Sequence, residues 1–335
     1  MKDPITVIAE IGVNHNGDVK LAKECISAAA NSGANIVKFQ TFISNKLVTK
    51  NAPKAGYQKG DSEVDESQLE MLEKFELSAN DHYVLKDYAE NLGLEFLSSA
   101  FDIESLEFLE TLNPKRIKIP SGELNNYIFL REVGRLNKPT ILSTGMSTID
   151  EVCEAIKTLQ ENGLSKNNLT ILQCNTQYPT PPKDVNLAAM KMMQHKFNVK
   201  VGLSDHTIGT AVAIAAASLG ATLIEKHLTL NKQLPGPDHK ASLEPKEFKH
   251  MVENIRIVED ALGSAEKVVS TSESKNRLIA RKSIVALKDI KKGELFSEKN
   301  LTVKRPGNGI SPMKWQSLIG KKSNKDYFAD ELIDI

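Results

Sequence analysis

The chain has 335 residues, of which 40% are hydrophobic and 26% are charged, a composition that excludes a disordered or fibrous protein. Its 43 basic and 43 acidic residues give a formal net charge of zero, so we expect no broad electrostatic surface for nucleic acid or for a membrane. The apolar runs are far shorter than the roughly 18 residues of a membrane span. If the protein binds an anion, local side chains must supply the positive charge.

Short apolar runs alternate along the chain with longer segments of helical periodicity. The predicted strands are Thr6–Glu10, Asn35–Gln40, Glu95–Ser99, Arg116–Pro120, Thr140–Ser143, Thr170–Cys174, Lys200–Leu203 and Thr222–Lys226. The helical segments include Val19–Asn31, Glu104–Leu112, Ile149–Asn162 and Thr210–Leu219. Strand followed by helix, repeated eight times and ending near Leu262, predicts an α/β fold of the closed (β/α)8 TIM barrel type over residues 1–262. The competing architecture is a doubly wound open sheet, but no GxGxxG motif follows the first strand.

Two segments depart from this alternation. The loop Ile43–Glu66 is polar and long for a strand-to-helix connection, so we expect it to be functional or mobile. Residues 263–282 are predicted to be a linker, because Gly263–Lys275 is polar and rich in serine. Residues 283–335 then form a module with frequent Gly and Pro turns. About 53 residues is small for an independent core, so we expect this module to pack on something larger.

The N-terminal segment MKDPITVIAE has neither a basic stretch nor the hydrophobic core of a secretion signal. The three cysteines, Cys25, Cys153 and Cys174, are odd in number and lack the spacing of a metal site. A disulfide framework is therefore not expected, and the sequence predicts a cytoplasmic protein.

All eight predicted strands end in polar residues, and in a TIM barrel those ends build the active site. In chain order these residues are Glu10, Lys38, Gln40, Ser99, Lys118, Ser121, Glu123, Ser143, Asn175, Thr176, Ser204, His206, Glu225 and His227. One polar strand end would carry little information. Polar residues at all eight strand ends predict a functional site at the C-terminal mouth of the barrel.

Lys38 and Lys118 each lie inside an apolar strand, in IVKFQ and RIKIP. A lysine in such a place can extend to the rim of the barrel. With the strand-end serines beside them, the two lysines are better explained as a cradle for a phosphate or a carboxylate. A Schiff-base lysine, as in barrel aldolases, is the alternative, but it would need one desolvated lysine rather than two beside serines.

His206 and His227 end two adjacent strands, so their imidazoles are within reach of one metal ion. Each histidine alone would more often be structural or a proton carrier. Two imidazoles without clustered carboxylates or thiolates indicate an open site of moderate affinity, for which Mn²⁺ or Mg²⁺ is a better candidate than structural Zn²⁺.

Three carboxylates lie near the same strand ends. Glu10 and Glu123 are candidates for general acid or base chemistry, and the alternative is that they pair with the lysines. Asp238, in LPGPDH after the last strand, is either an acceptor for the hydroxyls of a polyol or an ordinary turn residue.

The motifs IAEIGVNHNG, VKFQT, KIPSGE, LSTGM, YPTP, GLSDHT, EKHLTL, PGPDHKAS and VKRPGNG occur in this order. Together they resemble the sialic acid synthase family over essentially the whole chain, most of all its bacterial N-acetylneuraminate synthases, with the legionaminate synthases nearly as similar. The resemblance implies a (β/α)8 barrel followed by a small antifreeze-like (SAF) domain. It also implies condensation of phosphoenolpyruvate (PEP) with an N-acylated hexose such as N-acetylmannosamine, which gives a nine-carbon 2-keto acid and phosphate by C–O cleavage. A divalent metal, Mn²⁺ or Mg²⁺, is the implied cofactor.

The resemblance also implies roles for individual residues. Those placed at the phosphate and carboxylate of PEP are Lys38, Ser99, Lys118, Ser121, Ser143, Thr176 and Ser204. The implied metal ligands are His206 and His227, the implied proton-transfer residue is Glu10, and the implied sugar-binding residues are Gln40, Glu123, Tyr178, Asp238 and Arg305. Arg305 belongs to the C-terminal module, which in this family enters the site of a partner subunit, so a domain-swapped homodimer is expected.

Three positions depart from the family's pattern. Ser99 lies in SSAF where many relatives have STPF, and Thr176 stands where some relatives have an Asn that contacts phosphate. Ile279 stands where some members place an aromatic residue against the N-acyl methyl group, which leaves the acyl specificity open.

Three alternatives to an N-acetylneuraminate synthase stay open. A legionaminate synthase would act on a 6-deoxy diacetamido hexose, which differs from N-acetylmannosamine mainly at C4 and C6. A Schiff-base aldolase would use Lys38 or Lys118. A sugar-binding or ice-binding protein is suggested only by the C-terminal module, and the polar residues at all eight strand ends argue against it.

Overall fold

The computed structural model describes residues 3–59 and 66–334. The chain divides into two compact units, residues 1–263 and residues 264–335. The first unit holds every predicted site residue except Arg305.

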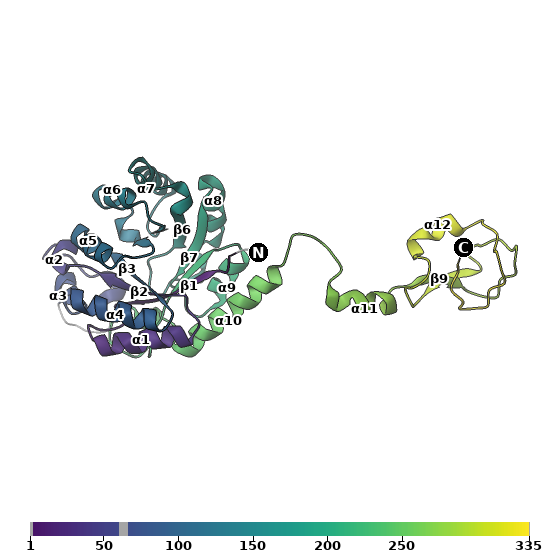
Figure 1. Ribbon diagram of the computed structural model, residues 1–335, viewed down its shortest axis with the longest axis horizontal. Coiled ribbons are helices and arrows are strands. Elements are labelled where there is room, and N and C mark those ends of the chain that lie inside the picture. The colour runs from purple at the N-terminus through teal and green to yellow at the C-terminus, as the bar shows by residue number, and fades with distance from the viewer. Residues whose placement is uncertain (1–2, 60–65, 335) are drawn as a thin grey trace. The chain divides into compact units, whose positions relative to one another are not determined.

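The first unit is a closed barrel of eight parallel strands with helices on its outside (Figure 1). The strands follow one another around the barrel in chain order, and β1 pairs with both β2 and β8 to close it. They are β1 Thr6–Gly12, β2 Ile36–Thr41, β3 Glu95–Ala100, β4 Ile117–Ile119, β5 Thr140–Ser143, β6 Leu169–Cys174, β7 Lys200–Asp205 and β8 Leu223–His227. The predicted TIM barrel is confirmed. β4 is shorter than predicted, because Pro120 has no amide hydrogen to give to a neighbouring strand.

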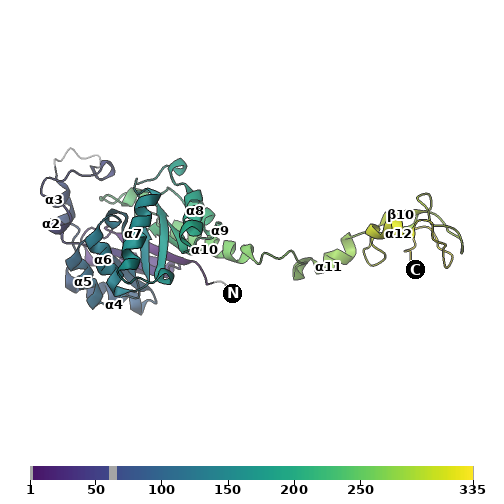
Figure 2. The same ribbon diagram turned by 90° about the horizontal axis from the view of Figure 1, so that it is seen from above.

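The helices of this unit are α1 Val19–Asn31, α2 Ser44–Leu47, α3 Gln68–Glu73, α4 Ala79–Asn91, α5 Ile103–Thr111, α6 Tyr127–Leu136, α7 Ile149–Glu161, α8 Leu187–Phe197, α9 Ala211–Ser218 and α10 Pro245–Leu262. Local sequence sets where several begin: Ser78 with Asp81, and Thr148 with Glu151, form capping boxes at α4 and α7. Helix α2 and a 3-10 helix, Gly56–Lys59, lie within the segment predicted as a long loop, whose residues 60–65 lie outside the described residues. Helices α2 and α3 lie side by side in both views (Figures 1 and 2).

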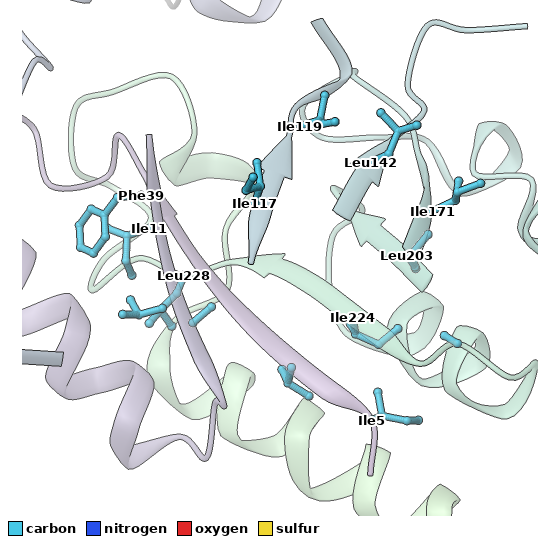
Figure 3. Close-up of a cluster of buried hydrophobic side chains, with 14 of the residues drawn as sticks. Ile5, Ile11, Phe39, Ile117, Ile119, Leu142, Ile171, Leu203, Ile224 and Leu228 are labelled. Carbon is cyan, nitrogen blue, oxygen red and sulfur yellow. The ribbon is translucent and has the colours of Figure 1, made fainter. Parts of the chain in front are cut away.

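Side chains alternate along each strand between the two faces of the barrel wall. Outward residues such as Ile11, Phe39 and Ile224 pack under the helices (Figure 3). Inside the barrel, an apolar floor is formed by Ile8, Ile36, Leu97, Ile141, Leu172 and Leu223. Two residues further along the same six strands stand Glu10, Lys38, Ser99, Ser143, Cys174 and Glu225. The two-residue period of the strands therefore places a polar layer directly above the apolar floor.

The second unit contains helix α11, Thr271–Ala280, an antiparallel pair of strands, β9 Ser283–Ala286 and β10 Leu301–Lys304, and helix α12, Trp315–Leu318. It has an apolar core of its own, built from Ile284, Ala286, Ile290, Phe296, Leu301, Leu318, Tyr327 and Ile333. Helix α11 lies inside the segment 263–282 that the sequence predicted as a linker. A capping box of Ser270 and Glu273 begins this helix, which accounts for its presence in a polar segment.

Among the described residues, no helix combines the length and the apolar character needed to cross a membrane.

Candidate active site

The C-terminal mouth of the barrel opens into a cavity of about 560 Å³. Every residue of the first unit for which the sequence predicted a role lines it: Glu10, Lys38, Gln40, Ser99, Lys118, Ser121, Glu123, Ser143, Thr176, Tyr178, Ser204, His206, His227 and Asp238. Arg305 follows β10 in the second unit, and its part in the site stays a prediction.

The two lysines lie at the bottom of this cavity, just above the apolar floor. Lys38 Nζ donates a hydrogen bond to Ser99 Oγ at 3.1 Å and lies 3.0 Å from Glu10 Oε2. Lys118 Nζ donates to Ser143 Oγ at 2.8 Å. The strand register produces this grouping, because Glu10 stands opposite Lys38 across β1 and β2 and Ser99 stands opposite Lys118 across β3 and β4. Two ammonium groups with hydroxyls beside them form a compact receptor for an anion.

A carboxylate to which the sequence analysis gave no role, Glu225, links the two lysines. Its oxygens lie 3.3 Å from Lys38 Nζ and 3.6 Å from Lys118 Nζ, and Ser204 Oγ donates to it at 2.7 Å. Strand alternation is the signal that finds it, because Glu225 stands two residues before His227 and faces the same interior.

Burial and mutual charge set the ionisation of this cluster. Burial raises the pKa of Glu10 to about 7, and the nearby Glu225 adds to the rise while Lys38 opposes it. Burial would also raise the pKa of Glu225, but Lys118 and Lys38 outweigh it and hold that pKa below its usual range. Burial lowers the pKa of Lys118, whereas Glu10 and Glu225 more than offset burial at Lys38 and raise its pKa. Near neutral pH, Glu10 is therefore the group of the cluster that can take up or release a proton.

Glu10 lies on the side of the cavity where His227 ends β8. Gln40 Nε2 donates to Glu10 Oε1 at 3.3 Å. Gly12 adopts a left-handed conformation with φ of 54°, and a Cβ there would lie 3.2 Å from both of these side chains and 3.3 Å from His227 Cε1. A glycine at this position thus permits Glu10, Gln40 and His227 to converge.

The two histidines lie together above β7 and β8. Their ring centroids are 5.3 Å apart, and Tyr178 stacks on His206 at 4.0 Å. Burial would lower the pKa of His206, but the neighbouring Cys174 and the carbonyl of Asn175, to which His206 Nδ1 donates at 2.6 Å, outweigh burial and raise that pKa.

This pair fits a divalent metal. Burial and the neighbouring His206 hold the pKa of His227 well below its usual value, so its ring is neutral, as a metal ligand must be. His227 Nδ1 is buried and has no hydrogen-bond partner among the described residues. Within that part of the chain, no three or more His, Cys, Asp or Glu side chains gather to hold a metal, so the pair can form only an open, two-ligand protein site.

The remaining polar residues lie around the rim. Glu123 Oε2 accepts a hydrogen bond from Asn126 Nδ2 at 2.6 Å rather than pairing with a lysine, and burial raises its pKa. Burial raises the pKa of Asp238 to about 6, and its Oδ2 lies 3.8 Å from His227 Nδ1. Ser121 Oγ accepts from the amide of Gly145 at 3.0 Å.

One side of the cavity is apolar. Its residues, called the apolar wall below, are Val13, Phe42, Leu47, Val48, Met71, Leu72, Phe75 and Phe101. They come from the segments just after β1, β2 and β3 and from α2 and α3 with the residues that follow them. This wall gave no signal in the sequence, because its members come from separate stretches between Val13 and Phe101 and only the fold brings them together.

Comparisons with known proteins match both units. The NeuB family model matches residues 25–267, and the SAF domain model matches residues 281–334. The N,N'-diacetyllegionaminic acid synthase of Campylobacter jejuni is 50% identical over 98% of both chains. The enzyme of the same name from Legionella pneumophila is 46% identical over 94% of this chain and 89% of its own.

A solved structure gives the same result for the fold. The N-acetylneuraminic acid synthetase of Leptospira borgpetersenii is 28% identical, with a TM-score of 0.73 over 82% of this chain and 90% of that one. The family model spans most of the barrel, and the two relatives are similar almost from end to end. The chain therefore belongs to the NeuB family of sialic acid synthases, with a C-terminal SAF domain.

Proposed function

We propose that this chain is a PEP-dependent synthase that condenses PEP with a 6-deoxy diacetamido hexose and water to give N,N'-diacetyllegionaminic acid and phosphate. The observation that carries this proposal is the 50% identity, over 98% of both chains, to a synthase of that name. The cavity supports the reaction type, because it combines a buried pair of lysines with two imidazoles.

The choice of sugar revises the first expectation from the sequence. The motifs favoured an N-acetylneuraminate synthase and gave the legionaminate synthase as the alternative. Two relatives that are 46% and 50% identical carry the legionaminic acid name, and they favour that alternative.

The charges at the cavity floor suit PEP. Lys38 keeps its positive charge, since Glu10 and Glu225 raise its pKa, and the negative charge of PEP would favour the charged form of Lys118, whose pKa burial lowers. Glu225 carries one negative charge, and Glu10 can be neutral at its pKa of about 7. The floor then has an excess of positive charge for a phosphate and a carboxylate. Much of the catalysis is positioning, since the lysines hold PEP while its enol carbon faces the sugar aldehyde.

Glu10 is the residue that we assign to proton transfer. Water must add to the former enol carbon and lose a proton before phosphate can leave, and the new hydroxyl must gain one. Glu10 lies beside Lys38, which would hold PEP, and on the side of the cavity where His227 lies, next to the expected position of the sugar aldehyde. One carboxyl group can therefore serve the reacting carbons of both substrates. A divalent ion held by His206 and His227 would supply Lewis acidity at the sugar aldehyde.

A phosphate-release assay with purified protein tests the proposal. The protein is stripped of metal, reloaded with Mn²⁺ or Mg²⁺, and supplied with PEP and either N-acetylmannosamine or the 6-deoxy diacetamido hexose. We expect phosphate release to require metal and sugar, with the higher kcat/KM for the diacetamido sugar. A higher kcat/KM for N-acetylmannosamine would restore the first expectation.

One observation favours a second candidate, the Schiff-base aldolase. Burial lowers the pKa of Lys118, as an imine-forming lysine requires. Borohydride treatment in the presence of pyruvate decides between them: a covalent adduct on Lys118 supports the aldolase, and metal-dependent activity without an adduct supports the synthase.

A further inference from the structure

The apolar wall is unusual for a cavity that is otherwise lined with charged and hydroxyl-bearing groups. Its eight side chains form a separate hydrophobic cluster, and all eight line the cavity. Leu47, Val48, Phe75 and Phe101 are only partly buried, so this cluster still has apolar surface to cover.

The wall begins where the polar layer ends. Phe42 follows Gln40 by two residues, Phe101 follows Ser99 by two, and Val13 follows Glu10 by three. Each of these apolar residues thus directly follows the end of a strand that carries a predicted site residue. A substrate that rises from the floor towards the mouth on the side of β1 to β3 must pass along the wall.

The wall is fixed in place by the surrounding fold. Asp102 accepts a hydrogen bond from the amide of Ile43 at 3.0 Å while it also caps α5, so the chain next to Phe42 is tied to the barrel. The rings of Phe42 and Phe101 meet edge to face with centroids 6.2 Å apart. A surface that is held this way is a preformed binding surface rather than one that a ligand must order.

Simple packing beneath a long connection is the competing explanation, because small apolar clusters often form there. Packing alone would turn these side chains towards one another and away from the cavity. Here every member lines the cavity, and the partly buried ones lie next to the site where a sugar is expected.

We propose that the apolar wall determines sugar specificity by receiving the C6 methyl group of a 6-deoxy hexose. This inference rests on the proposed function, since it assigns one group of the proposed sugar to one surface. A methyl group against the wall removes apolar area from water. A hydroxymethyl group in the same place would lose hydrogen bonds to water without gaining a partner.

The test uses two sugars that differ in one oxygen atom, N-acetylmannosamine and its 6-deoxy analogue. Steady-state kinetics with saturating PEP give kcat/KM for each. For the unmodified protein we expect a ratio of about 10 to 100 in favour of the 6-deoxy sugar, the usual range for one small group in an apolar pocket.

Two substitutions change the wall's polarity with little change of shape. Val48→Thr and Leu47→Asn each exchange part of an apolar side chain for a polar group. We expect both to lower kcat/KM for the 6-deoxy sugar and to raise it for N-acetylmannosamine, so that the ratio falls several-fold. A purely structural role would lower both values together. Val258→Thr, on α10 and outside the cavity, is the matched control and should leave the ratio unchanged.

The outcomes separate this inference from the proposed function. A preference for the 6-deoxy sugar that survives both wall substitutions would overturn the wall's role and leave the synthase intact. A ratio near one in the unmodified, active enzyme would also overturn it. The proposed function fails only if the 6-deoxy diacetamido hexose releases no phosphate from PEP, and an enzyme that is specific for that sugar need not turn over either of the two test sugars. Saturation-transfer NMR with the 6-deoxy sugar then tests the role of the wall. Saturation of the C6 methyl group that becomes weaker in Val48→Thr supports contact with the wall. The absence of saturation at the C6 methyl group would overturn that contact.

Discussion

Glu225 sets the charge balance at the floor of the cavity. Without it, two buried ammonium groups would face each other with only Glu10, whose pKa is about 7, as a nearby carboxylate. Buried charges that lose a partner destabilise a fold strongly, because neither water nor an opposite charge compensates for them. Glu225 therefore stabilises the site before substrate arrives.

We predict that Glu225→Gln lowers the free energy of unfolding by about 3 kcal/mol, the usual cost of breaking a buried ion pair. PEP brings negative charge to the same lysines, so it should raise Tm more in this variant than in the unmodified protein. Thermal denaturation with and without PEP measures both effects, with Glu253→Gln on the exposed face of α10 as the control. Equal PEP-dependent shifts in the variant and the unmodified protein would contradict the assignment.

We predict that His206→Ala and His227→Ala each abolish Mn²⁺ binding. The site that we propose has only two imidazole ligands, and no third His, Cys, Asp or Glu joins them among the described residues. Titration of free Mn²⁺ by electron paramagnetic resonance measures the binding, and circular dichroism checks that the barrel remains folded. Near-normal affinity in either variant would show that the metal lies elsewhere.

The sequence was informative about polar residues and much less so about apolar ones at the site. A lysine or histidine inside an apolar strand stands out, so Lys38, Lys118 and His227 were found without coordinates. Glu225 was noted at the end of its strand but received no role, because it precedes a lysine and a histidine, and only the alternation of the strand separates the inward residues from Lys226. The apolar wall gave no signal, since Phe42 and Met71 look like ordinary core residues until the fold brings them together.

At the scale of elements, buried histidines hold the segments that follow β1 and β8. His15 Nδ1 accepts from the amide of Gly17 at 3.0 Å, and His239 Nδ1 meets Thr229 Oγ1 at 2.7 Å. Burial lowers the pKa of each to about 4. Both rings are thus neutral in the folded protein over a range in which they would be charged in the unfolded chain.

This arrangement predicts that each of the two histidines contributes stability that is lost as pH falls from about 6.5 to 4, whereas Glu10 and Asp238, whose pKa values are raised, contribute in the opposite direction. At these two histidines the unfolded chain binds more protons in that window than the folded one, so their contribution to the free energy of unfolding rises with pH. The contribution of each histidine is fully present above about pH 6.5 and is reduced by about 2 kcal/mol at pH 5. Urea denaturation at pH 7.5 and pH 5 measures it. Between pH 7.5 and pH 5, His239→Gln should lose about 2 kcal/mol less of its free energy of unfolding than the unmodified protein, whereas His250→Gln, on an exposed part of α10, should match the unmodified protein.

The elements themselves were largely predictable, because the barrel's strands are short apolar runs with regular spacing. Helix α11 was missed because composition was weighed above local signals. The segment Ser270–Glu273 has the serine and glutamate spacing of a capping box, and that pattern begins a helix even where the following residues are polar.

At the scale of the whole molecule, we predict that Arg305 completes the sugar site of a partner subunit in a domain-swapped dimer. Lys38→Ala and Arg305→Ala, as separate proteins, should each be nearly inactive. When subunits exchange at random, half of the dimers are hybrids, and each hybrid has one site without either change. Activity should return to about a quarter of the unmodified level, as expected for a two-fold dimer.

If Arg305 instead acts in the barrel of its own chain, every site keeps one of the two substitutions, and mixing restores no activity. Subunit exchange is verified independently with differently tagged chains. If activity does not return after mixing, the second unit acts on the barrel of its own chain.

The apolar floor also has a kinetic consequence. Ile8, Ile36, Leu97, Ile141, Leu172 and Leu223 are buried below the two lysines, so among the described residues the cavity ends at this floor. With the lysines at its bottom and the histidines and the apolar wall nearer the mouth, an anion must arrive before the sugar that covers it. The nine-carbon product, which covers the anion site, must therefore leave before phosphate can leave. We therefore expect an ordered mechanism in which PEP binds first and phosphate leaves last, which product-inhibition kinetics would reveal as competition between phosphate and PEP alone.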